Sequence, residues 1–560
     1  MARILPKDRK RDIWAIILLS VAFLVVASLS IYAVVASTKN DPEPPTSSPT
    51  ITSPPDTTSP PDGPETTFPL QTTPPSCTTP YPDITTPSTS PIPNTTLNPD
   101  TTSNLDTTSH PEATSSPDET PAPETTPLLC TTTPMSTIPP TSTTPLPPYE
   151  GPVAFHVYSR GSYAEVNNTI RYENSYVNTG SMDLTTGVFR APTDGTYVFN
   201  FVAPRSSNSM NDFCLNVRLD RNGLPIGNGP ICGYSYDEWT PASFNAVLNL
   251  KLNDTVEIFL EQGAIKASKG SDPPRTHFTG FLLEEELAFH AYRTVESFAS
   301  RKNETIPFHG LNTDIGDNFD LATSTFIAPV NGAYFFQFSG SSNITTDVIL
   351  VRNDDEPMGY GYTRNTHWGS AGFHTLWPLQ KGDKVYARLN TGQLDEADRD
   401  LKITNLLGFI VSNVMSDSMN STVHFHVIRT SSLYTGRPDG IGQLINYTRI
   451  ITNEGEGMNA SSGIFKAPES GLYAFHFTSH RGNSYIGPNA CSTVIQMRNN
   501  ETIGAGSNCH STYSAPIFFH SVLLLQTNDE IKILLYEGDI NAVIDHQMSA
   551  RFSGFLIYST

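Results

Sequence analysis

A fifteen-residue segment occurs three times in the second half of this chain, and this repetition constrains the fold more than any other feature. It reads GVFRAPTDGTYVFNF from Gly187, STFIAPVNGAYFFQF from Ser324 and GIFKAPESGLYAFHF from Gly463. We therefore divide the region into three repeats, 151–284, 285–412 and 413–560. Each repeat is long enough to form its own hydrophobic core, because a chain of this length buries roughly two thirds of its unfolded surface when it folds.

Each segment predicts a turn followed by a strand. The turn dipeptides are Asp194-Gly195, Asn331-Gly332 and Ser470-Gly471. Strict alternation then places aromatic side chains on one strand face in each repeat: Tyr197, Phe199 and Phe201; Tyr334, Phe336 and Phe338; Tyr473, Phe475 and Phe477. We interpret these stripes as core, with a subunit contact as the functional alternative.

Each repeat closes with a glycine inside a hydrophobic strand. The closing strands HFTGFLLE, NLLGFIVS and RFSGFLIYS carry Gly280, Gly408 and Gly554. A glycine in this position marks a place where a side chain would collide with neighbouring backbone. Many short strand-like runs without helical periodicity predict an all-β sandwich or jelly roll in each repeat.

These motifs give the chain a resemblance to a known family. The opening AFHVYSR, the central G-x-F-x-A-P-x-x-G-x-Y-x-F-x-F and the closing F-S-G-F-L resemble the globular head domain of complement C1q and its relatives, across nearly all of 151–560. The resemblance implies three tandem jelly rolls of the type shared with tumour necrosis factor, a fold usually assembled as a trimer. No G-X-Y collagen run lies upstream, so the collagen-borne partnerships of complement C1q are not implied.

The resemblance also raises calcium, which some heads of the family bind near the trimer axis through acids after the motif's second cysteine. The corresponding neighbourhoods hold Gly233, Arg364 or Asn365, and His510, so no acid is common to the three repeats. We expect no cofactor and no metal, with calcium as the alternative.

The N-terminus predicts a membrane anchor. Residues 13–36 contain no charged side chain, and about 20 apolar residues span a bilayer as a helix. A cleaved signal peptide is the alternative, although its apolar region is usually shorter. Basic residues precede the span at Arg3, Lys7, Arg9, Lys10 and Arg11. They predict a cytoplasmic tail at 1–12 and an extracellular C-terminus, which is the topology of a type II single-pass cell-surface protein.

Residues 41–148 predict a disordered, mucin-like stalk. They are rich in Pro, Thr and Ser, and no lysine or arginine occurs between Lys39 and Arg160. Such sequence buries too little apolar surface to fold and is typical of O-glycosylated spacers, with an unglycosylated linker as the alternative. Cys77 and Cys130 lie in this stalk, where they either cross-link chains or pair locally. The formal net charge of -21 argues against a nucleic-acid partner.

Four cysteines in the repeats predict two disulfides. The pairs are Cys214 with Cys232 in the first repeat and Cys491 with Cys509 in the third. Both pairs have the same separation, and an extracellular location permits disulfides. Zinc is the alternative, but the spacing differs from that of zinc sites. The second repeat has Thr346 and Arg364 near the matching places.

Nine N-x-S/T sequons are candidates for glycosylation, as expected of a secreted face. They stand at Asn94, Asn167, Asn253, Asn303, Asn343, Asn420, Asn446, Asn459 and Asn500.

A histidine recurs in the first strand of each repeat, at His156, His290 and His426, and His424 shares a strand face with His426. A metal site or a pH sensor is one interpretation. Descent from one ancestral strand is the simpler one. No G-x-S-x-G, H-E-x-x-H or P-loop pattern has a supporting context, so we expect no enzyme.

The sequence thus favours a glycoprotein that presents C1q-like heads for recognition or adhesion of an extracellular protein or glycan. A shed, cytokine-like signalling ligand and a structural spacer are the alternatives. The junctions between repeats are short and lack Gly/Ser linkers, so we expect the three repeats to pack as an intramolecular pseudo-trimer rather than as beads on a string.

Overall fold

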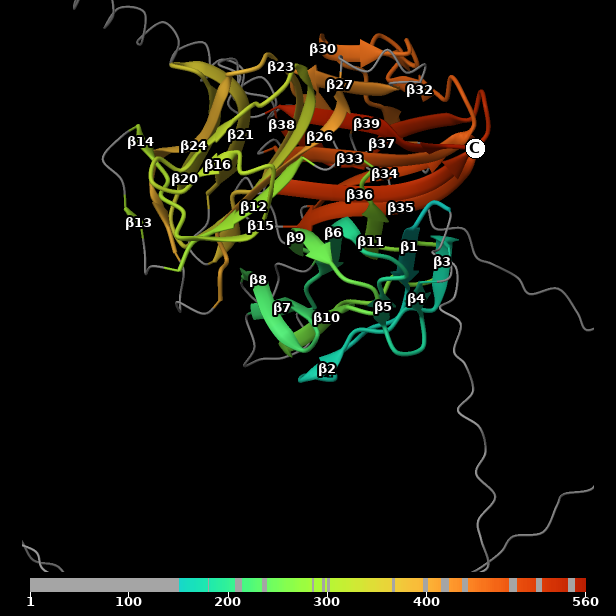
Figure 1. Ribbon diagram of the computed structural model, residues 1–560. Helices are drawn as coiled ribbons and strands as arrows, with labels where there is room; N and C mark the ends of the chain where they lie inside the picture. Colours follow the sequence, from blue (N-terminus) through green and yellow to red (C-terminus); the bar gives the residue numbers. More distant parts are fainter. Residues whose placement is uncertain are drawn as a thin grey trace, which may run out of the picture. The chain divides into compact units, whose positions relative to one another are not determined.

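The computed structural model describes most of the region that contains the repeats (Figure 1). The described residues are 151–179, 181–206, 214–233, 239–284, 287–294, 298–299, 303–364, 368–395, 401–413, 423–435, 442–482, 491–509, 516–541 and 549–560. They belong to the second of two compact units, Met1–Thr132 and Thr133–Thr560. The predicted tail, membrane span and stalk, with Asn94, Cys77 and Cys130, lie outside the described residues, as does Asn420.

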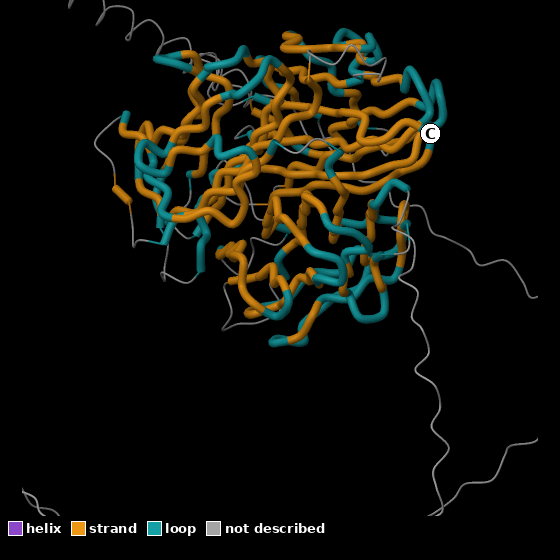
Figure 2. Tube along the Cα trace, viewed as in Figure 1, coloured by secondary structure: helices purple, strands orange, loops and turns teal. Residues whose placement is uncertain are grey.

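The described residues form strands and no helices, as expected of an all-β protein (Figure 2). Within these residues, no helix has the length and hydropathy of a membrane span.

The described residues of the first domain form eleven strands. They are β1 (Ala154–Ser159), β2 (Asn168–Thr169), β3 (Asn174–Asn178), β4 (Met182–Asp183), β5 (Val188–Arg190), β6 (Gly195–Pro204), β7 (Cys214–Arg221), β8 (Leu224–Cys232), β9 (Pro241–Leu250), β10 (Thr255–Gln262) and β11 (Thr276–Leu282).

The second domain repeats this order with short additional strands. Its strands are β12 (Ala288–Tyr292), β13 (Phe298–Ala299), β14 (Glu304–Thr305), β15 (Gly310–Ile315), β16 (Phe319–Asp320), β17 (Thr325–Ile327), β18 (Gly332–Ser339), β19 (Ser341–Ser342), β20 (Thr346–Arg352), β21 (Glu356–Thr363), β22 (Gly369–Ser370), β23 (Phe373–Leu379), β24 (Lys384–Thr391), β25 (Gln393–Leu394) and β26 (Asn405–Asn413).

The third domain completes the series. Its strands are β27 (His424–Arg429), β28 (Leu433–Tyr434), β29 (Gln443–Leu444), β30 (Arg449–Glu454), β31 (Met458–Asn459), β32 (Ile464–Lys466), β33 (Gly471–Arg481), β34 (Cys491–Arg498), β35 (Glu501–Cys509), β36 (Pro516–Leu525), β37 (Glu530–Glu537), β38 (Asp539–Asn541) and β39 (Ala550–Ser559).

Each domain is a jelly roll of two antiparallel sheets. In the first domain the inner sheet has the order β3-β1-β11-β6-β9, and the outer sheet has the order β4-β5-β10-β7-β8. The second domain repeats both orders, with β15-β12-β26-β18-β23 and β16-β17-β24-β20-β21. In the third domain β30, β27, β39, β33 and β36 form the corresponding inner sheet. The strands β9, β23 and β36 therefore occupy equivalent positions beside β6, β18 and β33.

The aromatic stripes form the core of each domain, which confirms their interpretation from the sequence. Tyr197, Phe199 and Phe201 are fully buried and pack with residues of both sheets, such as Phe155 of β1 and Val217 of β7. The equivalent stripes of β18 and β33 occupy the cores of the second and third domains. Alternation along the strand thus assigns one face of β6 to the interior of its own domain.

The glycine in each closing strand leaves room for aromatic rings. The prediction that a side chain at this position would collide with neighbouring backbone was therefore wrong. A Cβ atom on Gly280 would lie 2.4 Å from Cε1 of Phe155, and one on Gly554 would lie 2.5 Å from Cε1 of Phe425. A Cβ atom on Gly408 would lie 2.6 Å from Cε1 of Phe289. Each glycine faces the phenylalanine that is its partner on the first strand of the same domain. The cross-strand ring explains why no larger residue fits there.

We expect Gly554→Ala to lower the free energy of unfolding of the third domain by about 1–3 kcal/mol, the usual cost of overpacking a core. The added methyl group would contact Phe425 and Phe475, at 2.5 and 2.7 Å, and both rings are fixed in the core. Thermal and denaturant unfolding of the purified chain measure the change.

Gly161→Ala is the matched control. Its added methyl group would lie 2.9 Å from Oε1 of Glu173, the end of an exposed side chain rather than a ring fixed in the core, so we expect a smaller loss of stability. An unfolding transition that Gly554→Ala leaves unchanged would contradict this account of the closing glycine.

Candidate functional site

The candidate site is the region where the three domains contact one another. A cluster of buried hydrophobic residues draws its members from all three inner sheets. The cluster contains Ala154, Val198, Val247 and Phe281 from the first domain; Ala288, Ala333, Phe335, Leu376, Leu407 and Phe409 from the second; and Leu472, Ala474, Val522 and Phe555 from the third. The face of each inner sheet that points away from its own core is therefore covered by the neighbouring domains.

Three equivalent phenylalanines lie at the centre of this cluster. Phe281, Phe409 and Phe555 each follow the closing glycine of a domain. Their ring centroids lie 6.4, 6.0 and 5.9 Å apart in the three pairs, with interplanar angles between 64° and 76°. Edge-to-face packing at this distance is favourable beyond the area it buries. The nearly equal sides place one ring from each domain around a common centre.

We call the contact region between two neighbouring domains a seam. The three seams follow a cyclic order, since the first domain contacts the third, the second contacts the first and the third contacts the second. From β3 of the first domain, the Tyr176 hydroxyl donates a hydrogen bond of 2.5 Å to the carbonyl of Ile503 in the third. From β15 of the second domain, the Thr313 hydroxyl donates to the carbonyl of Val247 in the first, at 2.7 Å. From β30 of the third domain, Ile451 packs against the core of the second. Equivalent strands thus contact the next domain in each case.

A polar layer adjoins the phenylalanines. On β6, β18 and β33, a polar residue follows two positions after the cluster residues Val198, Phe335 and Ala474. Each polar residue is paired with another polar residue on the adjacent strand: Asn200 with Asn245, Gln337 with His374, and His476 with His520. All six side chains are buried. Each has at least one polar atom without a hydrogen-bond partner among the described residues. Buried polar atoms of this kind are rare and costly, so this layer stabilises the seams less than the hydrophobic cluster does.

The recurring histidines of the first strands lie at the three seams. The His156 ring lies beside the backbone of Val522 in the third domain, and the His290 ring lies beside the backbone of Val247 in the first. His426 Nε2 lies 3.2 Å from the hydroxyl of Thr375 in the second. Each histidine thus reaches the strand of its neighbour that is equivalent to β9.

Burial is the main cause of the electrostatic shifts in these seams. It lowers the pKa of His290 to about 3 and that of His520 to about 3, and it lowers the pKa of His277 to about 4. It lowers the pKa of Arg551 to about 10 as well. Within the part of the chain that the structure describes, no group of histidines, cysteines and acids has the geometry to hold a metal ion.

Both cysteine pairs are disulfides in the structure, Cys214–Cys232 and Cys491–Cys509. In each pair the two cysteines stand directly opposite each other on adjacent strands, β7 with β8 and β34 with β35. Each bond closes one end of an outer sheet.

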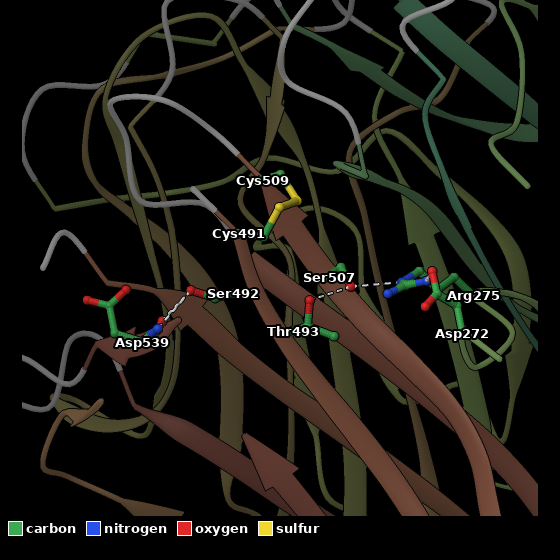
Figure 3. The surroundings of a disulfide bond; sticks show 8 residues. All are labelled: Asp272, Arg275, Cys491, Ser492, Thr493, Ser507, Cys509 and Asp539. Atoms are coloured by element: carbon green, nitrogen blue, oxygen red, sulfur yellow. Dashed lines mark hydrogen bonds and ion pairs between the residues drawn. A yellow bond between two sulfur atoms is a disulfide. The ribbon is translucent and has the colours of Figure 1, made fainter. Parts of the chain in front are cut away.

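The seam between the first and third domains lies beside the second of these disulfides (Figure 3). Arg275, immediately before β11, donates a hydrogen bond of 3.0 Å from Nε to the hydroxyl of Ser507 on β35. That hydroxyl lies 3.0 Å from the hydroxyl of Thr493 on β34. The Arg275 guanidinium also lies 4.3 Å from the Trp239 ring centroid and 3.7 Å from Asp272. An arginine of one domain thus extends the outer-sheet network of another.

The cysteine-free second domain has a pair of threonines at the position of the disulfide. Thr346 on β20 stands directly opposite Thr363 on β21, in the register of Cys214 and Cys232. Thr363 directly precedes Arg364, which the sequence places near this position, because each strand of this hairpin is one residue shorter and its turn one residue longer than in β7 and β8. Thr363 is fully buried, and its hydroxyl has no partner among the described residues.

The sequon asparagines that the structure describes are all exposed: Asn167, Asn253, Asn303, Asn343, Asn446, Asn459 and Asn500. An open hollow of about 490 Å³ in the third domain is lined by Tyr447, Ile450, Met458 and Asn459, among others. Gly233 and Arg364, from the neighbourhoods considered for calcium, are described, whereas Asn365 and His510 lie outside the described residues.

Sequence reasoning missed the residues that join the domains. The phenylalanine after each closing glycine recurs in all three repeats, so a signal for it was present. His374 and His520 stand at one position of the second and third repeats, where the first repeat has Asn245, so a signal for these two was present as well. His277 and His476 each occur in one repeat only, and no pattern in a single sequence marks them.

Comparison with known proteins supports the three-domain division. The family model "C1q domain" matches residues 154–283, 288–411 and 424–557, which is more than half of the chain. The chain is 33% identical over 115 residues to complement C1q tumor necrosis factor-related protein 3 of Homo sapiens, covering 20% of this chain and 46% of that relative. It is 29% identical over 117 residues to Caprin-2 of Danio rerio, covering 20% of this chain and 13% of that relative.

The matched relatives extend beyond the shared region, since the chain spans about half the length of the first of them or less. Among solved structures, the globular domain of zebrafish complement 1qA matches with 17% identity and a TM-score of 0.19, covering 25% of this chain and 99% of that one.

We expect Thr346→Cys combined with Thr363→Cys to form a third disulfide and to stabilise the second domain by about 3 kcal/mol, because the bond would close a loop of 17 residues. The substitution also removes the unpartnered hydroxyl of Thr363. Non-reduced peptide mapping detects the bond, and unfolding with and without reductant measures its effect.

Thr346→Cys with Tyr362→Cys is the control, because successive side chains point to opposite faces of a strand and these two thiols would not meet. Free thiols in the Thr346/Thr363 variant would contradict the register described above.

Proposed function

The chain belongs to the C1q-domain family, and from that premise we propose that its three domains act as a single recognition head displayed at the cell surface. Domains of this family serve recognition or signalling. The observation that carries the proposal is that three such domains account for nearly all of the described residues and cover one another's inner sheets. The ligand we propose is an extracellular protein or glycan.

We propose that the head is a pseudo-trimer built from one chain. Two observations support three equivalent domain positions. The rings of Phe281, Phe409 and Phe555 form a triangle, and the seams follow a cyclic order. The connections support it as well. β12 begins six residues after β11 ends, so an extended chain covers at most about 22 Å between them. Such a short tether keeps each domain at a high effective concentration for its neighbour.

We propose that residues 13–36 anchor the chain and that 41–148 hold the head away from the membrane. The support is the uncharged segment of membrane-spanning length, the basic residues before it and the Pro/Thr/Ser composition after it. The exposed sequons of all three domains agree with a head that passes through the secretory pathway. Release of the head from the stalk would instead make it a shed signalling ligand.

We expect an epitope attached at Thr560 to stain intact cells and one attached at Met1 to stain only permeabilised cells. The reason is that the basic flank stays in the cytoplasm. Staining of the C-terminal epitope only after permeabilisation would reject the topology. Recovery of that epitope mainly from the medium would favour the shed form.

We expect the fragment 151–560 to have the mass of a single chain after deglycosylation and to bind a cell-surface, matrix or microbial ligand. Light scattering measures the mass, and protein and glycan arrays measure binding. The variant Phe409→Glu places a charge among the three central rings. We expect it to separate the domains and to weaken binding at least about tenfold through loss of joint contacts.

Two outcomes would contradict the proposal. A folded fragment that binds nothing across broad arrays would argue against recognition and for a structural spacer. An obligate assembly of three chains would reject the single-chain pseudo-trimer.

A further inference from the structure

We propose that the seams form an acid-sensitive lock, in which protonation of the histidines buried between the domains opens the contacts among them when the surrounding pH falls from neutral to about 5. The lock holds at neutral pH because these rings are uncharged and buried between the domains, where His374 and His426 hydrogen-bond side chains of the neighbouring domain. The inference depends on the contacts among the domains and not on the identity of any ligand.

The first part of the lock is its presence at every seam. His156, His290 and His426 are fully buried, and each lies against a residue of the next domain around the cycle, with a hydrogen bond from His426 to Thr375. The His156 ring also lies 5.0 Å from the Tyr176 ring, on the strand that reaches the third domain. Proton uptake therefore acts on all three contacts rather than on one.

The second part is a cluster of rings between the second and third domains. His374 Nδ1 of the second domain lies 2.7 Å from the Thr478 hydroxyl of the third. The His374 ring lies 5.7 Å from the ring of His476 and 6.2 Å from that of His426. His476 and His520 are joined by Nδ1 atoms that lie 2.9 Å apart, so one of these nitrogens carries a proton and the other accepts it. Protonation of both rings would leave two donors facing each other.

The third part is a histidine between the first and third domains. His277 Nδ1 lies 3.1 Å from His156 Nε2, and its ring packs 5.0 Å from Phe519 of the third domain. A Cβ atom on Gly504 of the third domain would lie 2.6 Å from the His277 ring. The close backbone approach leaves little room for water to solvate a charged ring there.

No negative group compensates a charge on these rings within the described residues. Between the second and third domains, the charged and titratable neighbours are His426, His476, His520 and Arg551 for His374; Arg551, Arg449 and His374 for His426; His520 and His374 for His476; and His277, His374 and His476 for His520. In the other seams they are His156, Tyr158 and His520 for His277; His277 and Tyr176 for His156; and Lys402 for His290. A proton on His374, His426 or His290 would thus lie near a permanent cation, and protons on several of the rings would place like charges together in a dry interface.

The direction of the pH dependence follows from burial. Burial lowers the pKa of His520 to about 3 and that of His277 to about 4, and it holds the pKa of His374 and His476 well below 6.5. In opened seams the rings reach water and regain a pKa near 6.5. The open form therefore binds more protons below pH 6.5, and acid favours it until the pH falls below the lowered values.

Protonation of these histidines shifts the equilibrium between closed and open seams by a large factor. A histidine that stays neutral in the closed form and titrates with a pKa near 6.5 in the open form shifts the equilibrium towards opening by ~30-fold at pH 5. Two such histidines released together shift it by roughly 1,000-fold. The opening is reversible because the disulfides and the core of each domain stay intact.

Hydrogen exchange of the purified full-length chain, with exchange times corrected for the intrinsic effect of pH, tests the lock. We expect the strands that line the seams, β9, β23 and β36, to lose protection at least tenfold between pH 7.4 and pH 5.0, and to regain it at pH 7.4. The outer-sheet strands β7, β20 and β34 should keep their protection, because they pack within their own domains.

Variants separate this lock from ordinary acid unfolding. His476→Gln with His520→Gln removes two titrating rings, keeps polar side chains of related size and should open at least about tenfold less at pH 5.0. His290→Gln tests the seam between the first and second domains separately, in case the double variant folds poorly. His309→Gln is the control, since His309 is exposed and its ring accepts a hydrogen bond from Thr294 of its own domain, and the variant should open as the unaltered chain does.

Three results would overturn the inference. Seam strands that keep their protection at pH 5.0 would show inert histidines of a permanent interface. Equal loss of protection in the outer sheets would show global acid unfolding. Opening of the glutamine variants at the same pH and to the same extent as the unaltered chain would show that other groups are responsible.

Discussion

The burial of three apolar sheet faces against one another is the interaction on which the arrangement of the domains depends. In each inner sheet the aromatic stripe faces inward, and hydrophobic residues such as Val198, Phe335 and Ala474 face outward. Exposed separately, these faces would be apolar patches on three domains. The strands β9, β23 and β36 are also free on one side within their own domains, and unprotected edges invite unwanted pairing. Cyclic packing covers both at once.

The two adjacent layers in the seams have different energetic roles. The hydrophobic cluster around Phe281, Phe409 and Phe555 gains free energy from burial alone, at about 25 cal/mol per Å² of apolar surface. The neighbouring layer of Asn200, Gln337 and His476 contains polar atoms whose desolvation offsets part of that gain. Because the net stability of the interface is the difference between these terms, a modest change in the charge of the polar layer is enough to alter the association of the domains.

The fold was accessible from the sequence because alternation and turns are local. Tyr197, Phe199 and Phe201 identified the core face of their strand, and turn dipeptides located its start. The partners of the opposite face were not accessible, because the period of a strand says which residues share a face but not what covers it. Even so, Val198 between the aromatic residues was a signal, since a strand with two apolar faces is typically buried on both sides. The ring opposite Gly280 depended on cross-strand register, which a single sequence does not give.

A single chain can place different residues at equivalent positions of its three domains, whereas a trimer of identical chains cannot. In a trimer of identical chains, a histidine at the position of His374 would appear three times around the axis, and three protonated rings would repel one another together. Here the equivalent positions are Asn245, His374 and His520, and those of their cross-strand partners are Asn200, Gln337 and His476. The titrating groups of this layer are thus concentrated between the second and third domains, while the first domain contributes amides that do not titrate. Covalent linkage of the repeats therefore allows each seam to have its own pH response, and it allows the domains to separate at one seam while the chain keeps them within reach of one another.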